Sequence, residues 1–216
     1  MELGVFVATK IDDWELIREA EALGYDRAWV PDSQMIWSDC YATLALAAAN
    51  TTRIKLGTGV AIPGTRLAPV TAHSIASINR LAPGRVFLGI GTGHTAMRVM
   101  GMPPMPVGAF CDYLRVVRAL LRGDEVDYTH DGVTRAIRFL HLEVHGGPCT
   151  YLVPAERRFV TPETIRASAL VGEPDEVIAQ IRAAEAAGLR EIALLPSMAT
   201  ARTVLREFGE RVIARY

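Results

Sequence analysis

The chain has 216 residues, of which half are hydrophobic and 22% are charged, and its formal net charge is −1. This length allows one sizeable core and lies near the lower limit for a closed α/β barrel, about 200 to 250 residues. The near-neutral charge provides no basic surface, and no leader or apolar run of about 18 residues is visible. We therefore expect a cytoplasmic protein whose partners include neither nucleic acid nor membrane.

Short apolar runs alternate with longer amphipathic segments in the first half of the chain. Strands are predicted at 3–8, 27–33, 53–62 and 85–93. Helices are predicted between and after them, at 12–24, 39–50, 69–84 and 109–122. The strands are apolar on both faces, as expected for a parallel sheet that is covered by helices. Residues 1–122 are therefore expected to form the first four βα units.

The pattern changes at residue 123. Residues 123–145 alternate polar and apolar side chains around the turn HDG, which predicts an inserted β-hairpin. The section 149–216 follows a glycine-proline break and is mainly helical. Its predicted elements are helices at 161–172 and 173–189, a strand at 191–197 and a last helix that ends at Tyr216.

These runs predict five parallel strands, whereas a closed (β/α)8 barrel has eight. We therefore expect one α/β domain over residues 1–216, of the TIM-barrel (β/α)8 type, in which central βα units are missing or the sheet has closed with fewer strands.

Ligands of such barrels bind where the strands end and the helices begin. One predicted strand runs into PDSQMIW, which contains Asp32 and Trp37, and the next contains GTGVAIPGTR. The strand at 85–93 ends in GTG, directly before His94. An acid, an indole, small residues beside bare backbone and a free helix N-terminus together suit a flat ligand that carries an anionic group.

Each of these features has a simpler explanation. Asp32 could be a helix cap or a turn acid, Trp37 could fill the core, and the glycines of the third strand could mark a bulge. However, three successive strand ends carry the same kinds of residue, which favours a binding site.

The residue spacing does not support a dinucleotide-binding loop or a metal site. The glycines at 89, 91 and 93 do not have the G-x-G-x-x-G spacing of a dinucleotide-binding loop, because His94 stands where the third glycine is needed. The stretch HLEVH at 141–145 has no further ligand nearby, and the three cysteines are widely spaced. We therefore expect no metal site.

Residues 28–93 resemble the bacterial luciferase-like family of barrel oxidoreductases, and within it the branch that depends on the deazaflavin coenzyme F420 and includes methylenetetrahydromethanopterin reductase. The pattern G-V-x-x-P-x-x-R-x-x-P, which begins at Gly59 and includes Arg66, is followed by GRVFLGIGTG. The resemblance continues over about the first 125 residues and returns in the segment LVGEPDEVIAQIRAAEAAGLREIALLPS.

The resemblance implies a set of cofactor contacts. Similar proteins place the acid after the second strand, here Asp32, and a nearby aromatic, here Trp37, around the isoalloxazine or deazaflavin ring. They often have a non-proline cis peptide bond in the third strand, which falls here at Gly59–Val60. The turn at Thr92 and Gly93 resembles their cofactor-contacting turn.

Two residues depart from the pattern of the F420-dependent branch. Some of those enzymes have a histidine directly after the strand-2 acid, where this chain has Ser33. Some have a glutamate as proton donor after GTG, where this chain has His94. An imidazole can take the same role, so Asp32 and His94 are the expected catalytic residues.

The resemblance also reveals a gap. Similar proteins have further βα units after the hairpin, whereas this chain passes from His145 to Tyr151 through GGPCT. A partner chain could cover the opening, the fold could close with fewer strands, or a middle segment could be missing from the sequence. We expect hydride transfer between F420 and a small organic substrate, or alternatively FMN-dependent monooxygenation or a non-catalytic flavin-binding dimer. In each case a homodimer is expected.

Overall fold

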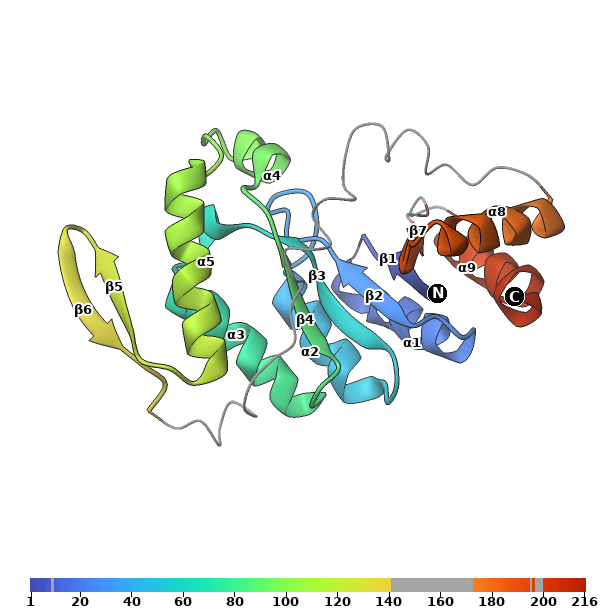
Figure 1. Cartoon of the computed structure of the whole chain (residues 1–216), viewed down its shortest axis with the longest axis horizontal. Coiled ribbons are helices and arrows are strands. Elements are labelled where there is room, and N and C mark those ends of the chain that lie inside the picture. The colour runs from blue at the N-terminus through green and yellow to red at the C-terminus, as the bar shows by residue number, and fades with distance from the viewer. Residues whose placement is uncertain (9, 141–172, 195, 197–199) are drawn as a thin grey trace.

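The computed structural model describes residues 1–8, 10–140, 173–194, 196 and 200–216. It contains a five-stranded parallel sheet, with a row of helices over one face, and a separate two-stranded hairpin (Figure 1). Both termini lie near α8 (Pro174–Ala186) and α9 (Ala201–Arg211), at the end of the molecule opposite the hairpin (Figure 1). None of the described helices is both long and apolar enough to cross a membrane.

The five predicted parallel strands are confirmed. They are β1 (Glu2–Phe6), β2 (Arg27–Val30), β3 (Lys55–Ala61), β4 (Val86–Ile90) and β7 (Glu191–Leu194). Their order in the sheet is β4-β3-β2-β1-β7, and each neighbouring pair is parallel. Among the described strands, β4 and β7 lie at the two edges and are not paired with each other.

The helices form a row that follows the strand order. Neighbours in this row are α9, α1 (Trp14–Ala22), α2 (Cys40–Asn50), α3 (Ala68–Leu81) and α5 (Val107–Arg122). Each helix of the first four units returns the chain to the amino edge of the sheet, which is the geometry that parallel strands require. The predicted helices at 12–24, 39–50, 69–84, 109–122 and 173–189 are thus confirmed, and the one at 161–172 lies outside the described residues.

Three short helical elements, η1 (Ile11–Asp13), η2 (Pro63–Thr65) and α4 (His94–Val99), add to or change the predicted pattern. The chain enters α1 through the 3-10 turn η1, and a second such turn, η2, follows β3. The predicted strand at 85–93 is too long, because β4 stops at Ile90 and Gly93 begins the short helix α4. Gly93 has a φ of 83°, a left-handed conformation that glycine adopts at little cost.

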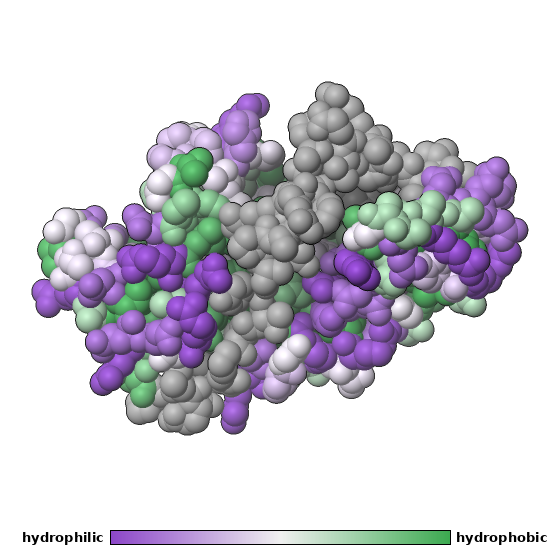
Figure 2. Space-filling view, in the orientation of Figure 1, coloured by the Kyte–Doolittle hydropathy of each residue, from purple (hydrophilic) through white to green (hydrophobic). Residues whose placement is uncertain are grey.

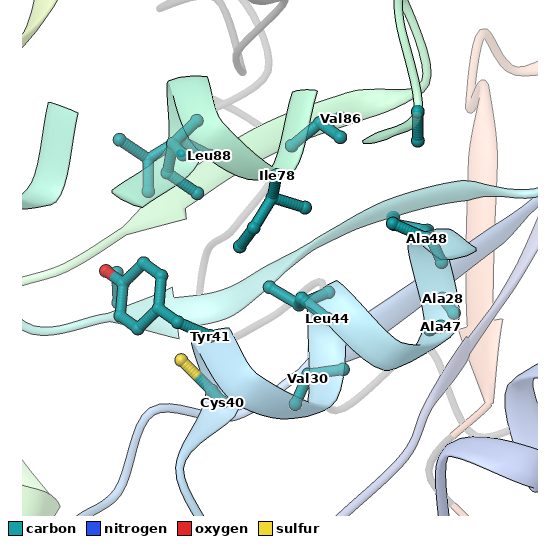
Figure 3. Close-up of a cluster of buried hydrophobic side chains, with 14 of the residues drawn as sticks. Ala28, Val30, Cys40, Tyr41, Leu44, Ala47, Ala48, Ile78, Val86 and Leu88 are labelled. Carbon is teal, nitrogen blue, oxygen red and sulfur yellow. The ribbon is translucent and has the colours of Figure 1, made fainter. Parts of the chain in front are cut away.

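The hydrophobic core lies between the sheet and the row of helices. Figure 3 shows Leu44 of α2 between Val30 of β2 and Ile78 of α3, with Val86 and Leu88 of β4 above them. Val30, Leu44 and Val86 are fully buried. Each such side chain contributes roughly 1.5–3 kcal/mol through removal of apolar surface from water.

The opposite face of the sheet has charges at its amino edge and aromatic rings above them. Glu2 lies 2.5 Å from Lys55 Nζ and also pairs with Arg27, whose Nε is 3.2 Å from a carboxylate oxygen of Glu191. The indole N–H of Trp29 donates to the other oxygen of Glu191 at 2.8 Å. The charges therefore neutralise one another on the face that lines the interior of a barrel.

The predicted hairpin is confirmed over its described part. β5 (Val126–His130) pairs with β6 (Val133–Ile137) in antiparallel register. The turn residues Asp131 and Gly132 both have positive φ, 50° and 76°, as a two-residue type I′ turn requires. The hairpin contacts α5 and projects from the body of the molecule (Figure 1).

Candidate functional site

The candidate site lies at the carboxyl edge of the sheet, where β2, β3 and β4 end side by side. The backbone N–H of Ile62, just after β3, donates to Asp32 Oδ2 at 3.2 Å. The N–H of Gly91, just after β4, donates to the carbonyl of Ala61 at 3.1 Å. The three strand ends that the sequence singled out are therefore joined by hydrogen bonds.

Asp32 is a buried residue of this edge, with 2% of its surface exposed. Its Oδ1 accepts a hydrogen bond from Gln34 Nε2 at 2.6 Å, and its Oδ2 accepts the one from Ile62. Burial raises the pKa of the Asp32 carboxyl, although the Ile62 N–H, the charge of Arg66 and the thiol of Cys40 oppose that effect. The cap of α2 is a different acid, Asp39, which accepts from the N–H of its third following residue at 2.9 Å.

Trp37 belongs to a tight turn after β2. Its N–H donates to the carbonyl of Ser33 at 3.0 Å, and its side chain is half-buried. Met35 in the same turn has a φ of 63° and is 79% exposed. Trp37 is thus not one of the buried core side chains, which removes the core-filling explanation and leaves its indole in a loop at the candidate site.

The Gly59–Val60 peptide bond is cis. The pairing between β3 and β4 shifts in register between Thr58 and Ala61, so the bulge proposed for these glycines is also present. Val60 is 44% exposed. β3 therefore presents an apolar side chain at the edge of the sheet.

The turn after β4 lies beside the end of β3. Thr92 and Gly93 are half-buried, and a Cβ atom on Gly93 would lie 2.9 Å from Ile62 Cγ2. His94, the first residue of α4, is exposed. The structure thus brings Asp32, the end of β3 and the turn at 92–93 together, and leaves the His94 side chain in solvent.

Most of the strand glycines serve aromatic packing, which the sequence analysis missed. A Cβ on Gly57 would lie 2.2 Å from the Phe87 ring, and one on Gly59 would lie 2.4 Å from the Phe6 ring. Trp29 packs between these rings, with ring centroids 5.6 Å from Phe6 and 4.5 Å from Phe87. For Gly57 the available signal was its pairing with Phe87 of the neighbouring strand β4, whereas Phe6 lies on β1, two strands away from Gly59.

A pocket of about 380 Å³ opens beyond the ends of β1 and β7. Apolar residues, among them Phe6 and Val7, form part of its wall, and Lys10 and Arg202 lie among its polar residues. Phe6 also packs beneath Gly59, so the pocket adjoins the candidate site. Its volume lies within the range of sites for small organic ligands.

Apolar surface also follows the turn after β4. Val99, Met102 and Val107 are between 45% and 71% exposed. They belong to α4, its connection to α5 and the start of α5, where Figure 2 shows hydrophobic surface. Within the described part of the chain no group of three metal-ligating side chains occurs, and the HLEVH stretch lies outside it.

A parallel sheet with its candidate residues at the carboxyl edge is typical of α/β proteins, the TIM barrels among them. The luciferase-like monooxygenase family matches residues 12–152, which is more than half of the chain. The chain belongs to this family.

Two curated relatives share substantial sequence identity with the chain. A 5,10-methylenetetrahydromethanopterin reductase of Methanolobus tindarius is 41% identical over 115 residues, which cover 52% of this chain and 34% of the relative. An F420-dependent glucose-6-phosphate dehydrogenase of Mycobacterium avium is 38% identical over 129 residues, 53% of this chain and 38% of the relative. The match thus spans little more than a third of the length of either relative.

Solved structures share the fold at low sequence identity. A coenzyme F420 dependent tetrahydromethanopterin reductase from Methanopyrus kandleri superposes with a TM-score of 0.72 at 17% identity, over 100% of this chain and 99% of that one. A monooxygenase from Streptomyces bottropensis gives the same TM-score and identity over the full length of both chains. The fold is therefore that of the luciferase-like TIM barrels.

Proposed function

We propose that the chain carries the cofactor-binding part of an oxidoreductase that transfers hydride between coenzyme F420 and a small organic substrate. The observation that carries this proposal is the open carboxyl edge at β2–β4, which lies within the family match at 12–152. There Val60 is half exposed beside strand ends that bear little side-chain bulk.

The residues at this edge fit a flat ring system. A Cβ on Gly91 would lie 3.2 Å from Val60 Cγ2, so a larger residue there would cover the apolar surface that Val60 presents. Gln34 Oε1 is buried and has no hydrogen-bond partner among the described residues. The edge thus combines an apolar contact surface with polar groups beside it, as a ring with apolar faces and polar edges requires.

When bound, F420 supplies the hydride chemistry, and the chain supplies orientation and proton handling. In this proposal Val60, Thr92 and Gly93 would contact the ring, together with the backbone of Gly59, and Trp37 would form a wall of the site. Asp32 provides the negative charge beneath the end of β3. His94 holds or releases a proton at an imidazole nitrogen on the solvent side.

Sequence identity favours F420 over FMN. The relatives that are 33–41% identical to the chain include a methylenetetrahydromethanopterin reductase and two kinds of F420-dependent dehydrogenase. An FMN-containing monooxygenase of Pseudomonas putida is only 16% identical, and that likeness concerns the fold alone. FMN remains the alternative cofactor.

Fluorescence titration with F420 and, separately, with FMN tests the proposal. We expect saturable quenching by F420 at micromolar concentrations and weaker binding of FMN. Tight binding of FMN without binding of F420 would identify FMN as the cofactor. Absence of binding by both would contradict the proposed function.

A second candidate function is a non-catalytic flavin-binding protein that assembles as a homodimer. It is favoured by the short match to the curated relatives and by the two unpaired edges, β4 and β7, of the described sheet. Rapid-mixing spectroscopy distinguishes the two functions. Bound F420 that is neither reduced nor oxidised by any tested alcohol, sugar phosphate or reduced pterin would support the non-catalytic function.

A further inference from the structure

Arg66 follows the turn η2 and reaches back to the start of α2. Its Nη2 lies 2.7 Å from Asp39 Oδ2, and its guanidinium carbon lies 4.2 Å from the centroid of the Tyr41 ring. Asp39 also caps α2 by accepting from the N–H of Ala42. A planar guanidinium suits this combination of ion pair and ring stacking, whereas an ammonium group does not.

The backbone of Arg66 is held as well. Its carbonyl accepts a hydrogen bond from the Tyr113 hydroxyl of α5 at 3.0 Å, and that hydroxyl lies 2.5 Å from Thr71 Oγ1 of α3. Arg66 thus connects the loop after β2, the loop after β3 and two helices. It does so on the helix side of the strand ends that form the candidate site.

The Arg66–Tyr41 contact leaves polar atoms without partners. Arg66 Nε and Tyr41 Oη are buried and make no hydrogen bond to any described residue. An ion pair with Asp39 therefore satisfies only part of the guanidinium. The guanidinium charge also acts on the titratable groups of this neighbourhood.

Asp32 is one of these groups. The charge of Arg66 lowers the pKa of Asp32, against burial, which raises it. The other groups that face this neighbourhood are the Cys40 thiol and the Tyr41 hydroxyl on α2 and the Tyr113 hydroxyl on α5. Arg66 lowers the pKa of all three, although burial is the largest effect on each and raises it.

An ionised Asp32 has a structural consequence at the candidate site. A carboxylate accepts stronger hydrogen bonds than a carboxylic acid does, and Asp32 accepts from the Ile62 N–H and from Gln34. Ile62 directly follows the end of β3. The charge on Asp32 therefore fixes the strand end that presents Val60.

We propose that Arg66 is a positioning residue of the cofactor site, which ties the loop after β2 to the loop after β3 and places its positive charge in the neighbourhood of the Asp32 carboxyl beneath the end of β3. This inference rests on the proposed function for its role in binding, but its effect on Asp32 can be measured without a cofactor.

The first experiment measures the titration midpoint of the Asp32 carboxyl by 13C NMR of the ligand-free protein. In Arg66→Met the titration midpoint is expected to rise, and in Arg66→Lys to rise by less, because the charge remains. Arg53→Met is the matched control, since Arg53 lies before the amino end of β3 and pairs with Asp26. An Asp32 midpoint equal to that of the wild type in Arg66→Met would overturn the inference.

The second experiment measures F420 affinity across pH. At the acidic end of the pH range in which the protein is folded, Arg66→Met is expected to bind F420 more weakly than the wild type, with a smaller loss near pH 8 and partial recovery in Arg66→Lys. A merely structural role would weaken binding equally at both pH values, and that result would contradict the inference. If the wild type fails to bind F420, the proposed function fails, while the NMR titration still decides the role of Arg66.

A further variant keeps the test valid if Arg66→Met does not fold. Arg66→Gln keeps a polar side chain but removes the charge, so it tests the same effect with a milder change in packing. We expect the Asp32 titration midpoint to rise, as in Arg66→Met. An Asp32 midpoint that falls or stays constant in a folded Arg66→Gln protein would contradict the inference.

Discussion

At the scale of single residues, Gly57 and Gly59 of β3 matter because they have no side chain. Gly57 and Gly59 have no side chain where the rings of Phe87 and Phe6 lie. Trp29 fills the space between these rings. The rings of Phe6, Trp29 and Phe87 therefore pack on the face of the sheet opposite the helices, next to the strand ends that form the candidate site.

Gly57→Ala tests this packing. Its Cβ would lie 2.2 Å from the Phe87 ring, so the ring or the strand has to move. We expect the free energy of unfolding to fall by roughly 1–3 kcal/mol, as overpacked core substitutions do, measured by urea denaturation. Gly108→Ala on α5 is the control, because nothing lies within 4 Å of its added Cβ. Equal stability of the two variants would contradict the packing account.

Asp32 shows what a sequence can and cannot reveal at this scale. Its position after β2 was predictable, because an acid after an apolar run at the carboxyl edge is typical of barrel sites. Its hydrogen bond from the Ile62 N–H and the nearby charge of Arg66 were not predictable, because both residues lie about thirty residues away in sequence. The sequence therefore indicated the location of the acid but not its hydrogen bonds.

At the scale of elements, the alternation of strands and helices followed from periodicity. Strands that are apolar on both faces were recognised, and the Asp131–Gly132 turn marked the hairpin. A helix N-terminus after the strand at 85–93 was expected, but the bounds of α4 were not, because a helix of six residues is too short to show a helical period. The charged group at the amino edge of the sheet was also not predicted, because Glu2, Lys55 and Glu191 lie far apart in the sequence.

This charged group makes a pH-dependent contribution to stability. Burial raises the pKa of Glu2, but Lys55 and Arg27 outweigh it, so the pKa lies below the ordinary value of 4.5. A carboxyl whose pKa is lower in the folded state stabilises the protein above its unfolded pKa, and this contribution is lost as the pH falls through the folded pKa. The contribution of Glu2 is therefore expected to disappear as the pH falls below about 4.5.

In Glu2→Gln the free energy of unfolding should depend less on pH in the acidic range. Near neutral pH we expect a loss of roughly 1 kcal/mol or less, because the ion pairs are partly exposed. Below about pH 4 the difference from the wild type should shrink. Thermal unfolding at several pH values measures both, with the exposed Glu207→Gln as the control. A constant difference at all pH values would rule out this role of Glu2.

At the scale of the whole molecule, the described sheet has two open edges. β4 and β7 each have one neighbour among the described strands, and open edges are prone to pair with other chains. We propose that two copies of the chain associate. Sedimentation equilibrium should then give about twice the 23.5 kDa mass of one chain. A monomer at all concentrations tested would count against the homodimer.

The central claim is that F420 binds at the carboxyl edge of β2–β4, and one comparison tests it most directly. The F420 dissociation constant is measured for the wild type, for Gly91→Val and for the control Gly108→Val. Because a side chain at Gly91 would cover Val60, we predict that Gly91→Val weakens binding by about tenfold or more, or about 1.4 kcal/mol, while the control stays within about twofold. Wild-type affinity in a folded Gly91→Val protein would contradict the claim.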